Sequence, residues 1–356
     1  MDPNNACDPD AGLFGLDTPP RSADLHLLAI PWDATTSYRD GTRRGPAAIL
    51  RASHQLDMYD RALEITHLEN IAMIDPPPEI AALNAEARAH AEVVIAAAGR
   101  ETPTTRPHMD AVNELSERLN GWVRAETAAR LEEGRWVGIV GGEHSVPLGA
   151  IEAIASRHPG LGILHIDAHA DLRRAYEGFS NSHASIMDNV LRRCPEVARL
   201  VQVGIRDLCD EEASAIAEAK PRVMTFFDRD LADRTFAGEP WATTIAAILE
   251  PLPEKVYISF DIDGLSPDLC PNTGTPVPGG LTYNQAVALV TALGRSGRRI
   301  VGFDLCEVAP SRVDPTDEWD GNVGARILYQ LCGWTLRTQG RIVPASAAVT
   351  HDVDGR

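Results

Sequence analysis

The chain has 356 residues, of which 44% are hydrophobic, and this length suits one large α/β domain or two smaller ones. Its formal net charge is −18 and no run of Lys or Arg stands out. This charge argues against nucleic acid and against an anionic membrane surface as partners, and it is compatible with a small cationic substrate.

The N-terminal residues 1–24 are polar and rich in Pro, Asp and Asn, so we expect a flexible arm there. They lack the apolar segment of a signal peptide, and the chain has no run of about 18 apolar residues that would span a membrane. Six cysteines are scattered without a C-x-x-C pair, which predicts reduced thiols in a cytoplasmic protein. We expect one catalytic domain over 25–338 and a C-terminal tail over 339–356.

Apolar runs and helical patterns alternate along the chain. The runs that predict strands are 25–32, 136–140, 161–167, 200–205, 255–263 and 299–305. The patterns that predict helices are 45–56, 83–99, 109–134, 283–295 and 322–334. Continuous apolar runs are typical of strands covered on both faces. The alternation therefore predicts an α/β fold in which helices cover both faces of a mainly parallel sheet.

Four of the expected strands end in side chains that are able to bind a metal. The segment HIDAHADLR (165–173) is the clearest case, because alternate residues of a strand point to one face. In open parallel sheets, ligands bind at the carboxyl ends of the strands. The residues at these four strand ends are His144, Asp167, His169, Asp171, Asp261, Asp263 and Glu307.

The number of donors indicates more than one ion. Four carboxylates and two imidazoles exceed the four ligands that zinc prefers, and they suit two divalent ions about 3.5–4 Å apart. Oxygen and imidazole donors fit Mn²⁺, Ni²⁺, Co²⁺ or Fe²⁺ without any thiolate. Such a pair lowers the pKa of a bridging water enough to supply hydroxide at neutral pH. The residues alone therefore predict hydrolysis.

Five sequence blocks resemble a known family. GGEHS, DAHADL, NSHAS, SFDIDGLSPDLCPNTGTPVPGGLT and the Glu of LCEVAP are similar, in this order, to the signature blocks of the ureohydrolases, the arginase and agmatinase family. The resemblance runs from about residue 25 to about residue 335. It implies an arginase-type three-layer α/β/α fold, a dinuclear centre of Ni²⁺ or Mn²⁺, and a homo-oligomer, either a trimer or a hexamer.

The resemblance also implies a role for each site residue. One ion would take His144, Asp167, Asp171 and Asp261, and the other would take Asp167, His169, Asp261 and Asp263. Asp171 would bond the bridging hydroxide and pass its proton to the leaving nitrogen, and His183 would exchange protons with bulk water. Glu307 would accept two N–H bonds from the substrate guanidinium. An ordinary loop histidine and a capping carboxylate are the alternatives for His183 and Glu307.

Two positions depart from the family pattern. Glu143 stands where most members have Asp, and Ser266 replaces the Asp of D-G-L-D-P. Neither departure removes a metal ligand, so we expect an active enzyme. A non-catalytic assembly subunit of a heteromeric ureohydrolase and a one-zinc amide hydrolase of the related deacetylase fold are the alternatives from other functional classes.

The substrate is harder to predict. Arg173 and Arg174 would repel a cationic tail such as that of agmatine, unless both point to solvent. Trp319 would close over a small substrate by cation–π contact, unless it packs at a helix start. RRAYEGFSNSHASIM and DEWDGNVGARILYQLC resemble the guanidine hydrolase branch, whose offshoot, the metformin hydrolases, is heteromeric with a paralogous subunit. We therefore expect free guanidine, an alkylguanidine or a biguanide such as metformin as substrate, with agmatine or guanidinobutyrate as the alternative.

Overall fold

The computed structural model describes residues 7–8, 10–65 and 68–342, and one large sheet runs through them. Its strands are β1 (Leu25–Ala29), β2 (Ile71–Ile74), β3 (Trp136–Val140), β4 (Leu161–Ile166), β5 (Val197–Ile205), β6 (Val223–Phe227), β7 (Lys255–Asp261) and β8 (Arg299–Cys306). They lie in the order β2-β1-β3-β8-β7-β4-β5-β6, and each neighbouring pair runs parallel.

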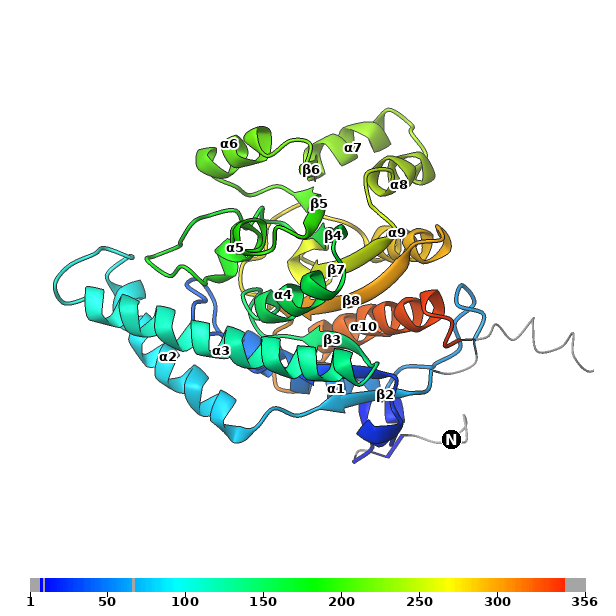
Figure 1. Ribbon diagram of the computed structural model, residues 1–356, viewed down its shortest axis with the longest axis horizontal. Helices are drawn as coiled ribbons and strands as arrows, with labels where there is room; N and C mark the ends of the chain where they lie inside the picture. Colours follow the sequence, from blue (N-terminus) through cyan, green and yellow to red (C-terminus); the bar gives the residue numbers. More distant parts are fainter. Residues whose placement is uncertain (1–6, 9, 66–67, 343–356) are drawn as a thin grey trace, which may run out of the picture.

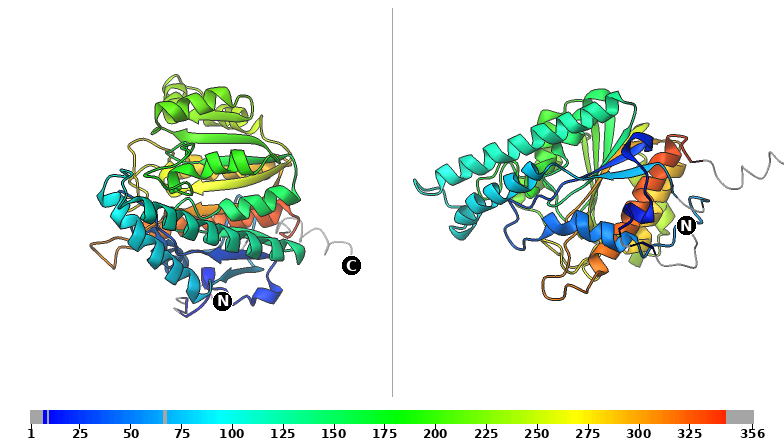
Figure 2. Two further views of the ribbon diagram at one scale, coloured as in Figure 1. Left: turned by 60° about the vertical axis from the view of Figure 1, so that its left-hand side comes forward. Right: turned by 90° about the horizontal axis from the view of Figure 1, so that it is seen from below.

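Helices cover both faces of this sheet (Figures 1 and 2). They are α1 (Gly45–Ser53), α2 (Pro78–Ala96), α3 (Arg106–Glu132), α4 (Leu148–Arg157), α5 (Ile186–Arg193), α6 (Asp210–Glu218), α7 (Asp228–Phe236), α8 (Trp241–Leu249), α9 (Tyr283–Arg295) and α10 (Trp319–Thr338). The α2, α3, α4 and α5 helices lie on one face, and α1, α9 and α10 lie on the other (Figure 2). The predicted three-layer fold with a parallel sheet is therefore confirmed.

The two outermost strands, β2 and β6, were not predicted. Both are short, and half of the residues of β2 and all but one of those of β6 are only partly buried, so neither leaves a long apolar run in the sequence. The predicted helix 83–99 begins five residues earlier in the structure, at Pro78, because a proline fits the first turn of a helix.

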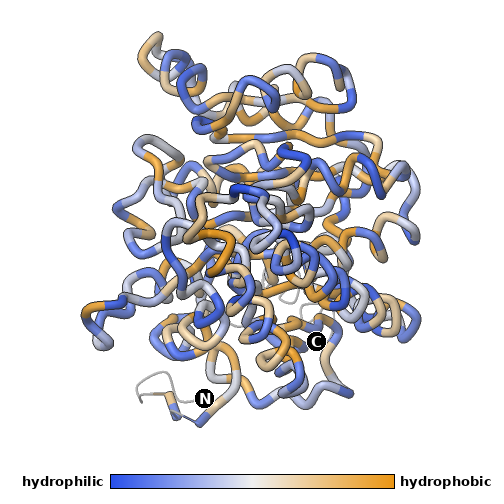
Figure 3. Tube along the Cα trace, turned by 90° about the vertical axis from the view of Figure 1, so that its left-hand side faces the viewer, coloured by the Kyte–Doolittle hydropathy of each residue, from blue (hydrophilic) through white to orange (hydrophobic). Residues whose placement is uncertain are grey.

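Close packing of the helices on the sheet forms the core. The side chains of β4 and most of those in β7 and β8 are buried, which explains their continuous apolar runs. On one face, α9 and α10 approach so closely that a Cβ at Gly294 would lie 2.1 Å from the Trp334 ring. Along the chain trace, hydrophobic and hydrophilic residues alternate every few positions (Figure 3), as expected for helices with one face toward the sheet.

Part of the expected N-terminal arm packs on the body of the protein. Leu13 and Phe14 are buried, and the Phe14 backbone N–H donates to Ser53 Oγ on α1 at 2.9 Å. The Phe14 ring also meets the Tyr329 ring of α10 edge to face, with centroids 5.2 Å apart. Residues 1–6 and 9 of the arm, and 343–356 of the expected tail, lie outside the described residues. None of the described helices is both long and apolar enough to cross a bilayer.

Candidate metal centre

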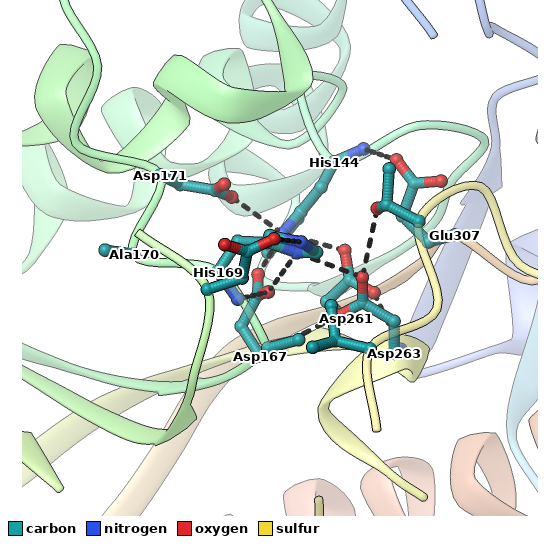
Figure 4. A network of polar contacts seen from close by, with 12 residues as sticks. His144, Asp167, His169, Ala170, Asp171, Asp261, Asp263 and Glu307 are labelled. Atoms are coloured by element: carbon teal, nitrogen blue, oxygen red, sulfur yellow. Dashed lines mark hydrogen bonds and ion pairs between the residues drawn. The ribbon is translucent and has the colours of Figure 1, made fainter. Parts of the chain in front are cut away.

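The predicted ligands lie together at the carboxyl ends of β3, β4, β7 and β8 (Figure 4). These four strands are neighbours in the order β3-β8-β7-β4, so residues from four distant parts of the chain meet at one edge of the sheet. The buried members are His144, Asp167, Asp171, Asp261, Asp263 and Glu307. His169 is also present, with 24% of its side chain exposed.

One group of ligands surrounds the imidazole of His144. Its Nδ1 lies 3.0 Å from Asp167 Oδ2, 3.3 Å from Asp171 Oδ2 and 3.3 Å from Asp261 Oδ2. A buried imidazole nitrogen facing three carboxylates is a donor set typical of a divalent transition metal.

A second group surrounds the imidazole of His169. Its Nδ1 lies 3.1 Å from Asp263 Oδ2 and 3.5 Å from Asp167 Oδ1. Asp167 is common to both groups, since one of its oxygens faces His144 and the other faces His169. The structure thus offers two adjacent positions for cations that share one carboxylate.

The acids of this cluster need a cation because they are buried together. Burial, with the neighbouring Asp167 carboxylate, raises the pKa of Asp171 to about 6. Burial and the charges of Asp263 and Asp167 raise the pKa of Asp261 well above its usual value. Holding several carboxylates out of water costs several kcal/mol unless positive charge offsets them. The donor set, oxygen with imidazole, fits Mn²⁺ or Ni²⁺.

Two site residues have an unusual backbone conformation. Asp171 has φ 56° and Glu307 has φ 64°, in the left-handed region that favours glycine. Such a residue costs of order 1–3 kcal/mol and persists only where its surroundings hold it. Glycine would remove this strain, but it would also remove the carboxylate.

Glu307 has one carboxylate oxygen engaged and one free. Its Oε1 accepts a hydrogen bond from the His144 backbone N–H at 2.9 Å (Figure 4). Its Oε2 is buried and has no hydrogen-bond partner among the described residues. Burial and the charge of Glu143 raise the pKa of Glu307 well above its usual value. Gly274 lies beside Oε2, since a Cβ there would be 3.0 Å from this oxygen.

A small cavity opens beside the ligands. Its volume is about 150 Å³, and its lining includes His169, Asp171, Arg173, Tyr176 and His183. A narrower space next to it is lined by Glu307, Gly274 and again His183. His183 therefore connects the two spaces. Burial and the nearby His169 lower the pKa of His183 to about 4.

The two departures from the family pattern do not disturb the ligands. Glu143 is buried and accepts hydrogen bonds from Trp32 Nε1, Ser145 Oγ, and both the backbone N–H and the hydroxyl of Thr35. Ser266 bonds Asp268 within its own loop. The longer arm of Glu143 is thus held by its own set of donors.

The three residues that the sequence related to the choice of substrate, Arg173, Arg174 and Trp319, lie in different surroundings. Arg173 lines the cavity, but its Nε lies 3.4 Å from Glu212 Oε2 and its guanidinium lies over the Tyr176 ring. Arg174 is exposed. Trp319 does not line the cavity: it is 48% exposed, it begins α10, and its indole N–H donates to the Asp268 carbonyl. Trp319 is the predicted site residue that the structure does not bring to the cluster.

His165 is a site residue that was not predicted from the sequence. This histidine is fully buried on β4, and its Nε2 lies 2.8 Å from Asp167 Oδ2. The signal was present in the sequence, because His165 stands two residues before Asp167 and therefore points to the same face of the strand.

Comparison with known proteins identifies the family. Residues 23–333 match the model of the arginase family. The chain belongs to the arginase family. It is 34% identical over 300 residues to an N(1)-aminopropylagmatine ureohydrolase from Thermus thermophilus, an alignment that covers 84% of this chain and 87% of that protein. It is 28% identical to the proclavaminate amidinohydrolase of Streptomyces clavuligerus, over 88% of this chain and 90% of that protein.

The fold agrees with this family. The crystal structure of the agmatine ureohydrolase of Thermoplasma volcanium superposes with a TM-score of 0.70 at 23% identity, over 92% of this chain and 94% of that chain. The predicted resemblance to the ureohydrolases is thus confirmed. The arginase-family chain is a metal-dependent hydrolase that acts on C–N bonds of linear amidines.

Proposed function

We propose that this arginase-family enzyme hydrolyses a small guanidine compound to urea or a urea derivative and releases ammonia or an amine. The substrate would be free guanidine, an alkylguanidine or a biguanide such as metformin. The observation that carries the proposal is a buried, unpaired carboxylate oxygen of Glu307 beside a cavity of about 150 Å³ at the metal ligands. Pockets for drug-sized ligands are usually about 300–1,000 Å³, so this space suits a smaller molecule.

The residues present fit two divalent ions, Ni²⁺ or Mn²⁺. We assign His144, Asp167, Asp171 and Asp261 to one ion, and Asp167, His169, Asp261 and Asp263 to the other. When bound, such a pair lowers the pKa of a water molecule and supplies hydroxide at neutral pH.

Glu307 would bind and orient the substrate. A guanidinium is a planar cation with several N–H donors, and a carboxylate that accepts two of them fixes its plane. The His144 backbone N–H holds Glu307 Oε1 in place, which leaves Oε2 and the remaining lone pair of Oε1 for the substrate. This contact would hold the guanidinium carbon against the ligand cluster.

Asp171 and His183 would move the protons. Both line the cavity, and His183 also lines the narrower space at Glu307. Asp171 would carry a proton to the leaving nitrogen, and His183 would exchange protons between this site and solvent. The hydroxyl oxygen of Thr35 lies 3.2 Å from His183 Nδ1 and helps to orient the ring.

Agmatine or guanidinobutyrate is the alternative substrate. Asp207 lines the cavity, its side chain is 66% exposed, and it would attract the second cation of agmatine. Two of the curated relatives are named N(1)-aminopropylagmatine ureohydrolase and agmatinase. Glu212, which lies beside Arg173, weakens the expected repulsion of a cationic tail.

We further propose that the enzyme is cytoplasmic and assembles as a homotrimer or homohexamer, or with a paralogous subunit. All six proposed metal ligands are present and gathered in one place. This supports an active chain over a purely structural subunit.

A substrate panel tests the proposal. The protein is loaded separately with Mn²⁺ and Ni²⁺, and urea, ammonia and amine release are measured for guanidine, methylguanidine, metformin, agmatine, guanidinobutyrate and arginine. We expect the highest kcat/KM for one of the first three, and background rates for Asp263→Asn under the same loading. A preference for agmatine or guanidinobutyrate would select the alternative. No turnover of any compound by a sample with two ions per chain would refute catalysis.

A further inference from the structure

A row of polar side chains crosses the sheet directly beneath the metal ligands. Strand register places Thr225 of β6 beside Gln202 of β5, Gln202 beside His165 of β4, His165 beside Ser259 of β7, and Ser259 beside Asp304 of β8. Neighbouring residues in register on parallel strands point to the same face. Four of the five are fully buried, and Thr225 at the edge is partly buried. We call these five residues the polar row.

Hydrogen bonds fix the orientation of one half of the row. The Gln202 amide nitrogen donates to the Ala170 carbonyl at 2.8 Å and lies 3.1 Å from His165 Nδ1, while its oxygen accepts from the Thr225 hydroxyl. Since a carbonyl only accepts, the amide cannot be reversed, and His165 Nδ1 must be the acceptor. With Nδ1 accepting, Nε2 carries a proton and donates it to Asp167 Oδ2 at 2.8 Å.

This bond completes the support of Asp167. Its Oδ1 already accepts from the His169 backbone N–H at 2.6 Å, so the protein bonds both carboxylate oxygens, and Oδ2 also lies 3.0 Å from the proposed ligand atom His144 Nδ1. Each oxygen keeps a lone pair for an ion. A shared ligand held at both oxygens presents fixed lone pairs to both cation positions.

The other half of the row lies behind His144. Once Nδ1, which faces the carboxylates of the cluster, gives its lone pair to an ion, the His144 ring proton belongs on Nε2. Nε2 lies 2.8 Å from Ser259 Oγ and 3.4 Å from Asp304 Oδ1. The second oxygen of Asp304 is buried and has no hydrogen-bond partner among the described residues. A carboxylate behind a ligating histidine fixes its ring and makes it a stronger ligand.

We propose that the polar row positions the ligands of the metal centre, with a different residue responsible for each of two ligands. His165 orients Asp167, which serves both ions, and Asp304 orients His144, which serves one ion. The inference rests on the proposed two-ion centre. His165 and Asp304 are positioning residues, since neither touches substrate.

The test is a metal-binding measurement on three variants. His165→Phe keeps a planar ring but removes the donor, so binding of both ions should weaken by about 10–100-fold. His165→Gln places an amide near the position of Nε2 and should recover most of this affinity. Asp304→Asn keeps the shape but removes the charge, so one ion should bind as in the wild type and the other about 10–100-fold more weakly.

Metal per chain is measured after equilibrium dialysis over a range of free Mn²⁺ concentrations, together with the visible spectrum of the Co²⁺-loaded protein. Thr244→Val on α8, which removes a hydroxyl bond to Glu239, controls for general destabilisation and should bind both ions normally. Wild-type affinity for both ions in His165→Phe and Asp304→Asn would overturn the proposal, as would equal weakening of both ions in Asp304→Asn. If His165→Phe does not fold, the pattern in His165→Gln and Asp304→Asn decides.

The assay contains no substrate, so a failure of the proposed guanidine hydrolysis would show only in the substrate panel.

Discussion

His169 is the most exposed of the six proposed ligands, and its imidazole faces two acids that are themselves buried. Replacing it with alanine leaves Asp263 with no imidazole partner and opens one of the two cation positions. We therefore expect His169→Ala to bind at most one ion and to lose turnover, as measured by metal analysis and urea release on the same sample. Full activity with two ions per chain would contradict the assignment of this ligand.

A second prediction at the scale of single residues concerns Glu307, the carboxylate proposed to bind the substrate. Glu307→Gln keeps its size but replaces one acceptor oxygen with a donor that opposes the guanidinium N–H groups. Losing a charge-assisted contact of about 2–4 kcal/mol would lower kcat/KM by roughly 30–1,000-fold. Metal content should stay at the wild-type value, which separates this effect from ligand loss. Glu250→Gln, an exposed position, is the control and should be unchanged.

At the scale of elements, α2 supports a loop of the site from outside the cluster. Arg88 Nη1 donates to the Thr36 carbonyl at 2.6 Å, and Asn84 Oδ1 accepts from the Asp33 backbone N–H at 2.8 Å. These bonds hold the 33–36 segment, whose Thr35 touches His183 and Glu143. The helix thus positions a residue that the metal ligands do not contact.

The support of Thr35 by α2 predicts that activity can be lowered without a loss of metal binding. Arg88→Met should lower kcat/KM by about tenfold, since a small misplacement of positioning groups is costly in catalysis. Both ions should still bind, because their ligands come from strand ends. Steady-state kinetics and metal analysis check the two parts. Arg118→Met on the exposed side of α3 is the matched control, and equal kcat/KM for Arg88→Met and wild type would reject the coupling.

At the scale of the whole molecule, the metal centre joins four strands in the middle of the sheet. Removing the ions leaves the acids of the cluster buried without an offsetting charge, so a chelator should lower Tm. Ligand linkage predicts a gain of about 4 kcal/mol at a metal concentration a thousandfold above Kd. Calorimetry over a series of Mn²⁺ concentrations checks this. A Tm that does not change with metal would contradict a centre built into the core.

Acid sensitivity should come partly from His158, at the end of α4. Burial and the charges of Lys255, Arg157 and Arg299 lower its pKa from 6.5 to about 4. The unfolded chain therefore takes up this proton first as pH falls, and the stability contributed above pH 6.5 is lost between 6.5 and 4. His158 is only partly buried, so the expected loss is roughly 1 kcal/mol.

Urea unfolding at pH 7.5 and pH 5 measures this effect. His158→Gln should lose less stability than the wild type between the two values, because it cannot take up the proton. An identical loss in both proteins would assign the acid sensitivity to other groups.

The sequence by itself determined the periodic and local features. Continuous apolar runs marked the six inner strands, because a strand covered on both faces has no polar face to show. The D-x-H-x-D block predicted that Asp167, His169 and Asp171 lie together, but strand alternation was the wrong reason, because β4 ends at Ile166 and all three lie in the segment beyond it. The family blocks then assigned the metal ligands, which the structure gathers at one site.

Only the tertiary structure decided which distant segments are neighbours. The order β3-β8-β7-β4 brings four strand ends together, and the register across five strands aligns His165 with Ser259 and Asp304. Packing also buried Phe14 and left Trp319 away from the cavity. A local pattern records periodicity and burial, but strand neighbours depend on how the helical connections pack over the whole sheet, and that is a property of contacts between residues far apart in the chain.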